Sequence, residues 1–323
     1  MCRLIVIGNG FDLAHGLPTN YCDFMKYLLA DEIQPLFFGE SNYACQTSVL
    51  SHTQAKHHFY KALNKYIPEQ ALWCSFENAL ALLDEEQLQD DNSSYLLGYG
   101  DEHWHESAHH DFQNMIGEAL SFSLDIPMYL RQWICCIDTH VPPSIYSNII
   151  NNNCLFLTFN YTDTLESSYG ISSERILYIH GKARRWDNLI LGHHNNTLFQ
   201  DNSISKFQPE EEGELYYENY PDDVRIMEAK ELIKAYFRGT YKDTTSIIQK
   251  NQAFFYSLKG ISEVYILGHS LSSIDFEYFY EIKKHVPLTC QWNISYYSKC
   301  DYSNAQNLIS ALDIQNYHLF HTT

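Results

Sequence analysis

Four short polar motifs each include or follow an apolar run and contain residue types that can hold a ligand or move a proton. They are GNGFDLAHGLPT (8–19), TFNYTDTLE (158–166), YIHG (178–181) and YILGHSLSSID (265–275). Glycine lets the backbone approach a ligand closely. An asparagine amide donates and accepts hydrogen bonds, and histidine can act as a base near neutral pH. These types suit a site for a phosphate- and hydroxyl-bearing ligand.

The first motif is typical of a strand that ends in a tight turn before a helix. Gly8 and Gly10 allow the turn, and a helix that begins near Asp12 or Thr19 would present free N–H groups to an anion. Leu13 stands where G-x-G-x-x-G has its third glycine, which disfavours a standard hydride-transfer enzyme. The alternative is a strand–turn–helix corner with no ligand.

The second and third motifs place an amide and an imidazole at strand ends. Asn160 follows a buried strand and could hold a ribose hydroxyl or position a water, or it could form a turn or cap a helix. His180 precedes Gly181 and could serve as a general base. The alternative for His180 is a hydrogen bond to a backbone carbonyl.

The fourth motif again begins at the end of an apolar run. Gly268 permits close backbone approach, His269 and Ser270 could contact phosphate or ribose, and Asp275 could orient one of them or cap a helix. Ser270 lacks the following glycine of a G-x-S-x-G nucleophile elbow, which disfavours a serine hydrolase.

The elements that carry these motifs alternate between strands and helices. Short apolar runs predict strands at 4–7, 154–158, 176–179, 189–191, 264–267 and 292–297. This alternation predicts an α/β fold with a Rossmann-like, mostly parallel sheet. Ligands bind such sheets beyond the carboxyl ends of the strands, at the topological switch point. We therefore expect the motifs to converge on one crevice.

The remaining stretches predict a mainly helical insertion at 21–150, after the first strand–turn–helix, within a single domain spanning 1–323. Residues 21–83, 112–137 and 224–257 have helical spacing, and in 73–83 the residues Trp73, Phe76, Leu80 and Leu83 share one helical face. Residues 84–111 and 199–223 are polar and are expected to be loops.

Composition limits the classes of partner. The 323 residues include 21 Lys and Arg against 40 Asp and Glu, a formal net charge of −19. This charge disfavours a nucleic-acid backbone or a membrane surface as partner, and the basic residues Lys182, Arg184 and Arg185 form one local cluster. No apolar run suits a spanning helix or a signal peptide, so we expect a cytoplasmic protein.

Cysteine and histidine spacing gives no metal motif. The nine cysteines include no C-x-x-C pair and are expected to be reduced thiols. His105 and His109 have the i, i+4 spacing of helical metal ligands, but they lie in an acidic segment without H-E-x-x-H. We predict no metal cofactor.

In this order, the four motifs resemble those of the bacterial AbiH family, which is associated with abortive infection of phage-infected cells. Further matching segments are WCSFE (73–77) and LGHHN (191–195), so that the resemblance runs from residue 4 to about 280. AbiH is in turn similar to the sirtuin-like NAD-binding fold. The resemblance implies binding of NAD and its hydrolysis to nicotinamide and ADP-ribose.

The same resemblance implies a role for each matching residue. Asn160 would position the attacking water or the nicotinamide-side ribose, and His180 would act as base. Asp12 and Asp163 would stabilise the positive charge that develops on the ribose. The implied nucleotide-binding residues are Gly8, Asn9, Gly10, Phe11 and Thr19 in the first motif, and Gly268, His269, Ser270 and Asp275 in the fourth.

Two departures from the sirtuin-like pattern keep other functions open. Thr162 stands where the Asn-Tyr-Asp motif has its aspartate, and Asp163 lies one place later. The four-cysteine zinc module is absent, which points to a glycohydrolase and not a deacetylase. The alternatives are a nucleotide-sensing or partner-binding module without catalysis and a metal-dependent nuclease that uses Asp12, Asp163 and Asp275. A phage-derived trigger, a partner protein or self-association would control the activity.

Overall fold

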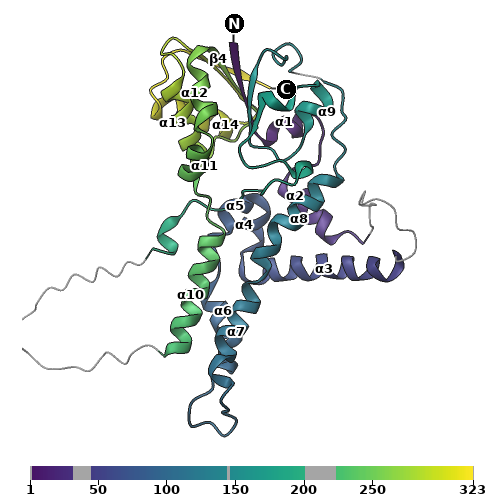
Figure 1. Cartoon of the computed structure of the whole chain (residues 1–323), viewed down its shortest axis with the longest axis vertical. Helices are drawn as coiled ribbons and strands as arrows, with labels where there is room; N and C mark the ends of the chain where they lie inside the picture. Colours follow the sequence, from purple (N-terminus) through teal and green to yellow (C-terminus); the bar gives the residue numbers. More distant parts are fainter. Residues whose placement is uncertain (1, 32–44, 144–145, 201–222, 323) are drawn as a thin grey trace, which may run out of the picture. The chain divides into compact units, whose positions relative to one another are not determined.

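The computed structural model describes residues 2–31, 45–143, 146–200 and 223–322 (Figure 1). The contacts divide the chain into two compact units. The first comprises Met1–Thr53, Pro127–Leu191 and Lys242–Thr323, and the second comprises Gln54–Ile126 and Gly192–Tyr241. The predicted loop at 199–223 lies almost wholly outside the described residues.

The first unit is built on a six-stranded parallel sheet. Its strands are β1 (Cys2–Ile7), β2 (Leu155–Thr158), β3 (Ile176–Tyr178), β4 (Ile261–Leu267), β5 (Gln291–Tyr296) and β6 (Tyr317–His321). They lie in the order β3-β2-β1-β4-β5-β6, and every neighbouring pair is parallel. The predicted α/β, Rossmann-like fold is confirmed. The order reverses between β1 and β4, which makes this the topological switch point.

Burial on both faces explains why β1 is an unbroken apolar run. Leu4 and Val6 belong to one core cluster, and Ile5 and Ile7 belong to another. Alternate residues of a strand point to opposite faces, so a strand covered on both sides needs apolar residues throughout. The polar residues of the first motif can begin only where this strand ends.

Helices make up most of the rest of the first unit. They are α1 (Asn9–Ala14), α2 (Tyr21–Leu29), α9 (Thr164–Tyr169), α11 (Thr244–Lys250), α12 (Gln252–Tyr256), α13 (Phe276–His285) and α14 (Lys299–Ala311). Short 3₁₀ turns lie at Ser173–Arg175, Ala183–Arg185, Ser257–Gly260 and Ser273–Asp275.

The described part of the second unit is helical and contains no strand. Its helices are α4 (Glu69–Cys74), α5 (Phe76–Ala79), α6 (Glu85–Asn92), α7 (Ala108–Leu120) and α10 (Val224–Gly239), with 3₁₀ turns at Ser93–Tyr95 and Asn196–Leu198. Helices α3 (Cys45–Tyr66) and α8 (Phe122–Cys136) run across the boundaries between the units. The prediction of a helical insertion after the first strand–turn–helix is confirmed. No described helix is both long and apolar enough to cross a membrane.

Some predicted elements were wrong. Residues 189–191 form no strand, because Ile190 makes single hydrogen bonds to His180 and Tyr161 instead of a ladder. The expected helix at 73–83 breaks at Ser75, whose backbone is not helical. Part of the expected loop at 84–111 is helix α6, which Asp84 caps by accepting a hydrogen bond from the amide of Gln87. Strand β6 was not predicted.

Candidate functional site

The loops that follow β1 and β4 touch through glycine backbones. The amide of Gly8 donates to the Leu267 carbonyl (3.1 Å), and the amide of Gly10 donates to the Gly268 carbonyl (2.7 Å). Gly268 has φ +60°, and a Cβ there would lie 2.2 Å from the backbone nitrogen of Phe11. Packing between the loops therefore requires these glycines, and the Gly10 amide is already engaged.

Asp12, in α1, is a buried carboxyl at this end of the sheet. Its side chain is 1% exposed, and its Oδ2 accepts a 2.5 Å hydrogen bond from the hydroxyl of Thr162. Burial raises the pKa of Asp12 to about 6, although hydrogen bonding from Thr162 and Thr164 acts in the opposite direction. Its other oxygen, Oδ1, is buried without a hydrogen-bond partner.

Asn160 supplies a second buried acceptor next to Asp12. It lies two residues beyond β2, is 7% exposed, and its backbone amide donates to the hydroxyl of Thr158. Its side-chain oxygen is buried without a partner, and its amide group helps to lower the pKa of the nearby Asp12 carboxyl. Two unsatisfied buried acceptors suit a ligand that donates hydrogen bonds.

His180 and His269 both contact one aromatic ring. The centroid of the Phe159 ring is 5.2 Å from that of His180 and 4.4 Å from that of His269. His180 Nε2 is 3.4 Å from the hydroxyl of Tyr278. Both imidazoles are buried. Because both contact Phe159, the third and fourth motifs meet near the carboxyl ends of β3 and β4.

Burial and charge keep both imidazoles neutral. Burial lowers the pKa of His180 well below its ordinary value; the charges of Lys242 and His269 act in the same direction, and that of Asp275 opposes them. Burial lowers the pKa of His269 to about 4, with Asp275 again opposing and Lys242 adding to the effect. His180 could therefore accept a proton at neutral pH but would not hold it readily.

Lys242 is a member of this cluster that the sequence did not reveal. Its ammonium lies 3.0 Å from Asp275 Oδ1, and the other oxygen of Asp275 lies 3.6 Å from His269 Nε2. The lysine side chain is 1% exposed. Burial alone would raise the pKa of Asp275, but the charges of Lys242, His269 and His180 and the hydrogen bond from Lys242 together outweigh it and keep that pKa below its ordinary value.

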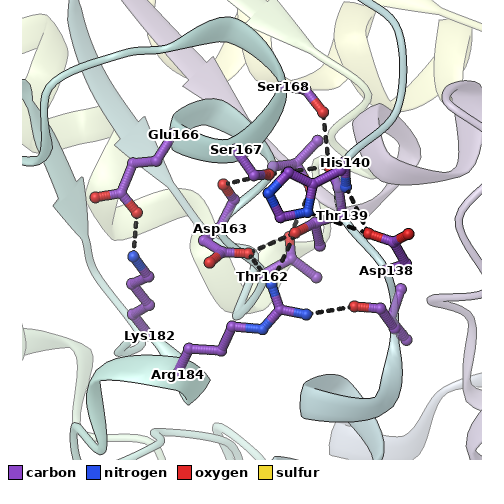
Figure 2. Close-up of polar contacts among 12 residues, drawn as sticks. Asp138, Thr139, His140, Thr162, Asp163, Glu166, Ser167, Ser168, Lys182 and Arg184 are labelled. Atoms are coloured by element: carbon purple, nitrogen blue, oxygen red, sulfur yellow. Dashed lines mark hydrogen bonds and ion pairs between the residues drawn. The ribbon is translucent and has the colours of Figure 1, made fainter.

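Asp163 belongs to a separate hydrogen-bond network (Figure 2). Its Oδ1 accepts hydrogen bonds from Thr139 Oγ1 (2.7 Å) and Arg184 Nη1 (2.9 Å). Arg184 also donates to the carbonyl of Ile137. The charge of Asp163 is thus compensated by a neighbouring guanidinium.

The basic cluster noted in the sequence is paired internally. Lys182 binds Glu166, Arg184 binds Asp163, and Arg185 binds Asp187. Figure 2 shows the first two of these pairs. Lys182 and Arg184 fasten the loop after β3 to α9 and its N-cap, whereas Arg185 and Asp187 both lie within that loop.

A comparison of the sequence with known protein families assigns the chain to one of them. Residues 4–296 match the family described as bacteriophage abortive infection AbiH. The chain belongs to the AbiH family. No curated protein and no solved structure matches the chain. Membership gives this chain a role in abortive infection.

The other expected nucleotide-binding residues of the AbiH chain lie around the same loops. Asn9 is exposed and donates to the Thr19 carbonyl (2.8 Å), while the Thr19 hydroxyl is buried without a partner. Phe11 is buried and stacks on Tyr146 at 5.4 Å between ring centroids. Ser270 is exposed.

The carboxylates of the nuclease alternative have different neighbours in this AbiH chain. Asp12 is bonded to Thr162, Asp163 to Arg184, and Asp275 to Lys242. Within the part of the chain that the structure describes, no group of three or more His, Cys, Asp or Glu is arranged to hold a metal ion.

Proposed function

We propose that this AbiH protein is an abortive-infection effector that binds NAD or a related nucleotide and hydrolyses it to nicotinamide and ADP-ribose. The observation that carries the proposal is the pair of unsatisfied acceptors, Asp12 Oδ1 and Asn160 Oδ1, beside the switch point of the sheet.

The strand order supports a dinucleotide as the ligand. The order β3-β2-β1-β4-β5-β6 is the one found in dinucleotide-binding Rossmann folds. Ligands of such sheets lie outside the carboxyl ends of the strands where the order reverses, here between β1 and β4. The two glycine loops follow these two strands.

The unsatisfied acceptors support a ligand with hydroxyl or amide hydrogens. A buried acceptor without a donor costs about 1–3 kcal/mol. Ribose hydroxyls and the nicotinamide carboxamide are both donors, so either would satisfy Asp12 Oδ1 and Asn160 Oδ1 and recover that free energy.

The charges suggest how the residues would share the reaction. Water would bond to the ribose carbon as the carbon–nitrogen bond to nicotinamide breaks, and His180 would take the proton of that water. Asp12, ionised above its pKa of about 6, would stabilise the positive charge on the ribose. Because Arg184 already compensates Asp163, Asp12 is better suited to this role.

One observation favours the second candidate, a nucleotide-sensing module without catalysis. The His180 side chain is 3% exposed, which leaves little room for a water beside it in this conformation. A module of this kind would bind the nucleotide at the same loops and transmit the binding to a partner.

Ligand-induced stabilisation tests the binding that both candidates share. NAD at 100 times its Kd should stabilise the protein by about 2.7 kcal/mol and raise its melting temperature. Asn160→Ala should abolish the increase, whereas Asn152→Ala, at an exposed asparagine of the same unit, should keep it. No increase for the unsubstituted protein would refute nucleotide binding at this site.

A further inference from the structure

Lys242 belongs to none of the four motifs, yet it contacts Asp275 of the fourth motif. It lies just before α11, and its carbonyl accepts a 2.9 Å hydrogen bond from the amide of Thr244. Its ammonium binds Asp275 Oδ1 at 3.0 Å. A lysine is costly to bury unless a charge compensates it. This pairing therefore requires Asp275 to be a carboxylate.

The carboxylate in turn faces the protonated ring nitrogen of His269. The amide of Leu271 donates to His269 Nδ1 at 2.9 Å, so Nδ1 carries no hydrogen. The imidazole proton must then lie on Nε2, which faces Asp275 Oδ2 at 3.6 Å. The ammonium thus sets the position of the carboxylate, the Leu271 amide sets the tautomer of His269, and the carboxylate faces the resulting Nε2–H.

The same ammonium acts on His180. Besides burial, the charges of Lys242 and His269 lower the pKa of His180 and that of Asp275 raises it, and the hydroxyl of Tyr278 lies 3.4 Å from His180 Nε2. In a buried site the lysine charge disfavours a second positive charge nearby. The charges of the Lys242 ammonium and the Asp275 carboxylate therefore act on both imidazoles.

We propose that Lys242 is a positioning residue of the site, which holds Asp275 as a carboxylate facing His269 Nε2 and adds a permanent positive charge to the buried histidine cluster. The use of these imidazoles rests on the proposed function, but their arrangement does not. Lys242 is also the residue at which the chain re-enters the first unit from the second. Two residues, Thr240 and Tyr241, separate it from the end of α10.

Nuclear magnetic resonance of protein carrying ¹⁵N-labelled histidine tests this assignment without requiring any activity. In the unsubstituted protein, His269 should be the Nε2–H tautomer, and both His180 and His269 should stay neutral between about pH 5 and 8. In Lys242→Met, Asp275 loses its cation, so one of the two imidazoles should take a proton in this range. Lys242→Arg keeps the charge and should keep the original signals.

Two further comparisons complete the test. Lys250→Met, at an exposed lysine of α11, should leave both imidazoles unchanged. If Lys242→Met does not fold, Asp275→Asn is compared with the double variant Lys242→Met/Asp275→Asn, which buries no lone charge. Loss of the lysine should then raise the pKa of His180. Identical tautomers and titrations with and without Lys242 would overturn the proposal, whereas failure of NAD binding alone would not.

Discussion

The hydroxyl of Thr162 donates a 2.5 Å hydrogen bond to the carboxyl of Asp12, 150 residues earlier in the chain. The bond joins the loop that follows β2 to helix α1. Thr162 stands where the sirtuin-like motif has an aspartate, and the structure brings a carboxyl to this threonine from α1. The substitution by threonine therefore does not remove the negative charge from the site.

Replacing the Asp12 carboxyl should make stability less dependent on pH. The pKa of Asp12 is about 6 in the folded protein and 3.8 ordinarily. The contribution of the protonated Asp12 to the free energy of unfolding is therefore fully present below pH 3.8 and is lost as the pH rises through 6. The loss amounts to about 3 kcal/mol. An asparagine cannot ionise, so the Asp12→Asn variant should not undergo this loss. Its stability relative to the unsubstituted protein should therefore increase between pH 4 and pH 8.

Urea unfolding at these two pH values measures the difference. Asp23→Asn, at an aspartate of α2 in the same unit, is the matched control and should not show this gain. An Asp12→Asn variant whose stability changes with pH as steeply as that of the unsubstituted protein would contradict the account of this carboxyl.

The contact between the two glycine loops should tolerate no side chain. In Gly268→Ala the new Cβ would lie 2.2 Å from a backbone nitrogen, and φ is +60°. We expect a loss of more than about 4 kcal/mol, or no folded protein. Gly170 has nearly the same φ of +63° but open space around it, so Gly170→Ala should cost only about 1–2 kcal/mol.

Chemical denaturation measures the loss of stability in each glycine variant and so separates the cost of the steric clash from the cost of backbone strain. Equal losses for Gly268→Ala and Gly170→Ala would mean that strain alone accounts for Gly268 and that the loops are not in close contact.

Arg184 should matter more to stability than the adjacent Arg185. Arg184→Gln removes hydrogen bonds to Asp163, Thr139 and the Ile137 carbonyl and should cost about 1–3 kcal/mol. Arg185 is more exposed and pairs only with Asp187 in the bonds described, so Arg185→Gln should cost less than about 1 kcal/mol. Thermal unfolding of the two variants makes the comparison, and the reverse order would contradict the network in Figure 2.

The sequence predicted the elements that depend on local pattern. Strand β1 was visible because both of its faces are buried, and the glycines after β1 and β4 marked their turns. The convergence of Asp12, Asn160, His180 and His269 followed from the rule that parallel strands end at one edge. The structure places Asp12 near Asn160, and His180 and His269 against the same Phe159 ring; that all four line one crevice, and the roles assigned to them, stay predictions.

The sequence could not reveal what depends on tertiary contacts. Lys242 belongs to no motif, and lysine is almost never fully buried unless paired, so nothing local distinguished it. Residues 189–191 had the composition of a strand, but a strand also needs an adjacent strand with which its backbone can form a ladder of hydrogen bonds. Helix α6 was hidden by its polar residues, since only Leu88 and Asn92 are buried on it.

Product analysis tests the central claim most directly. Purified protein is incubated with NAD, and free nicotinamide and ADP-ribose are separated by chromatography. We predict release by the unsubstituted protein and by His140→Ala, a control at an exposed histidine, and loss of release in Asn160→Ala and His180→Ala, by about 10²–10⁴-fold if His180 is the base. Release that survives within about threefold in both variants would contradict the site proposed for this AbiH protein.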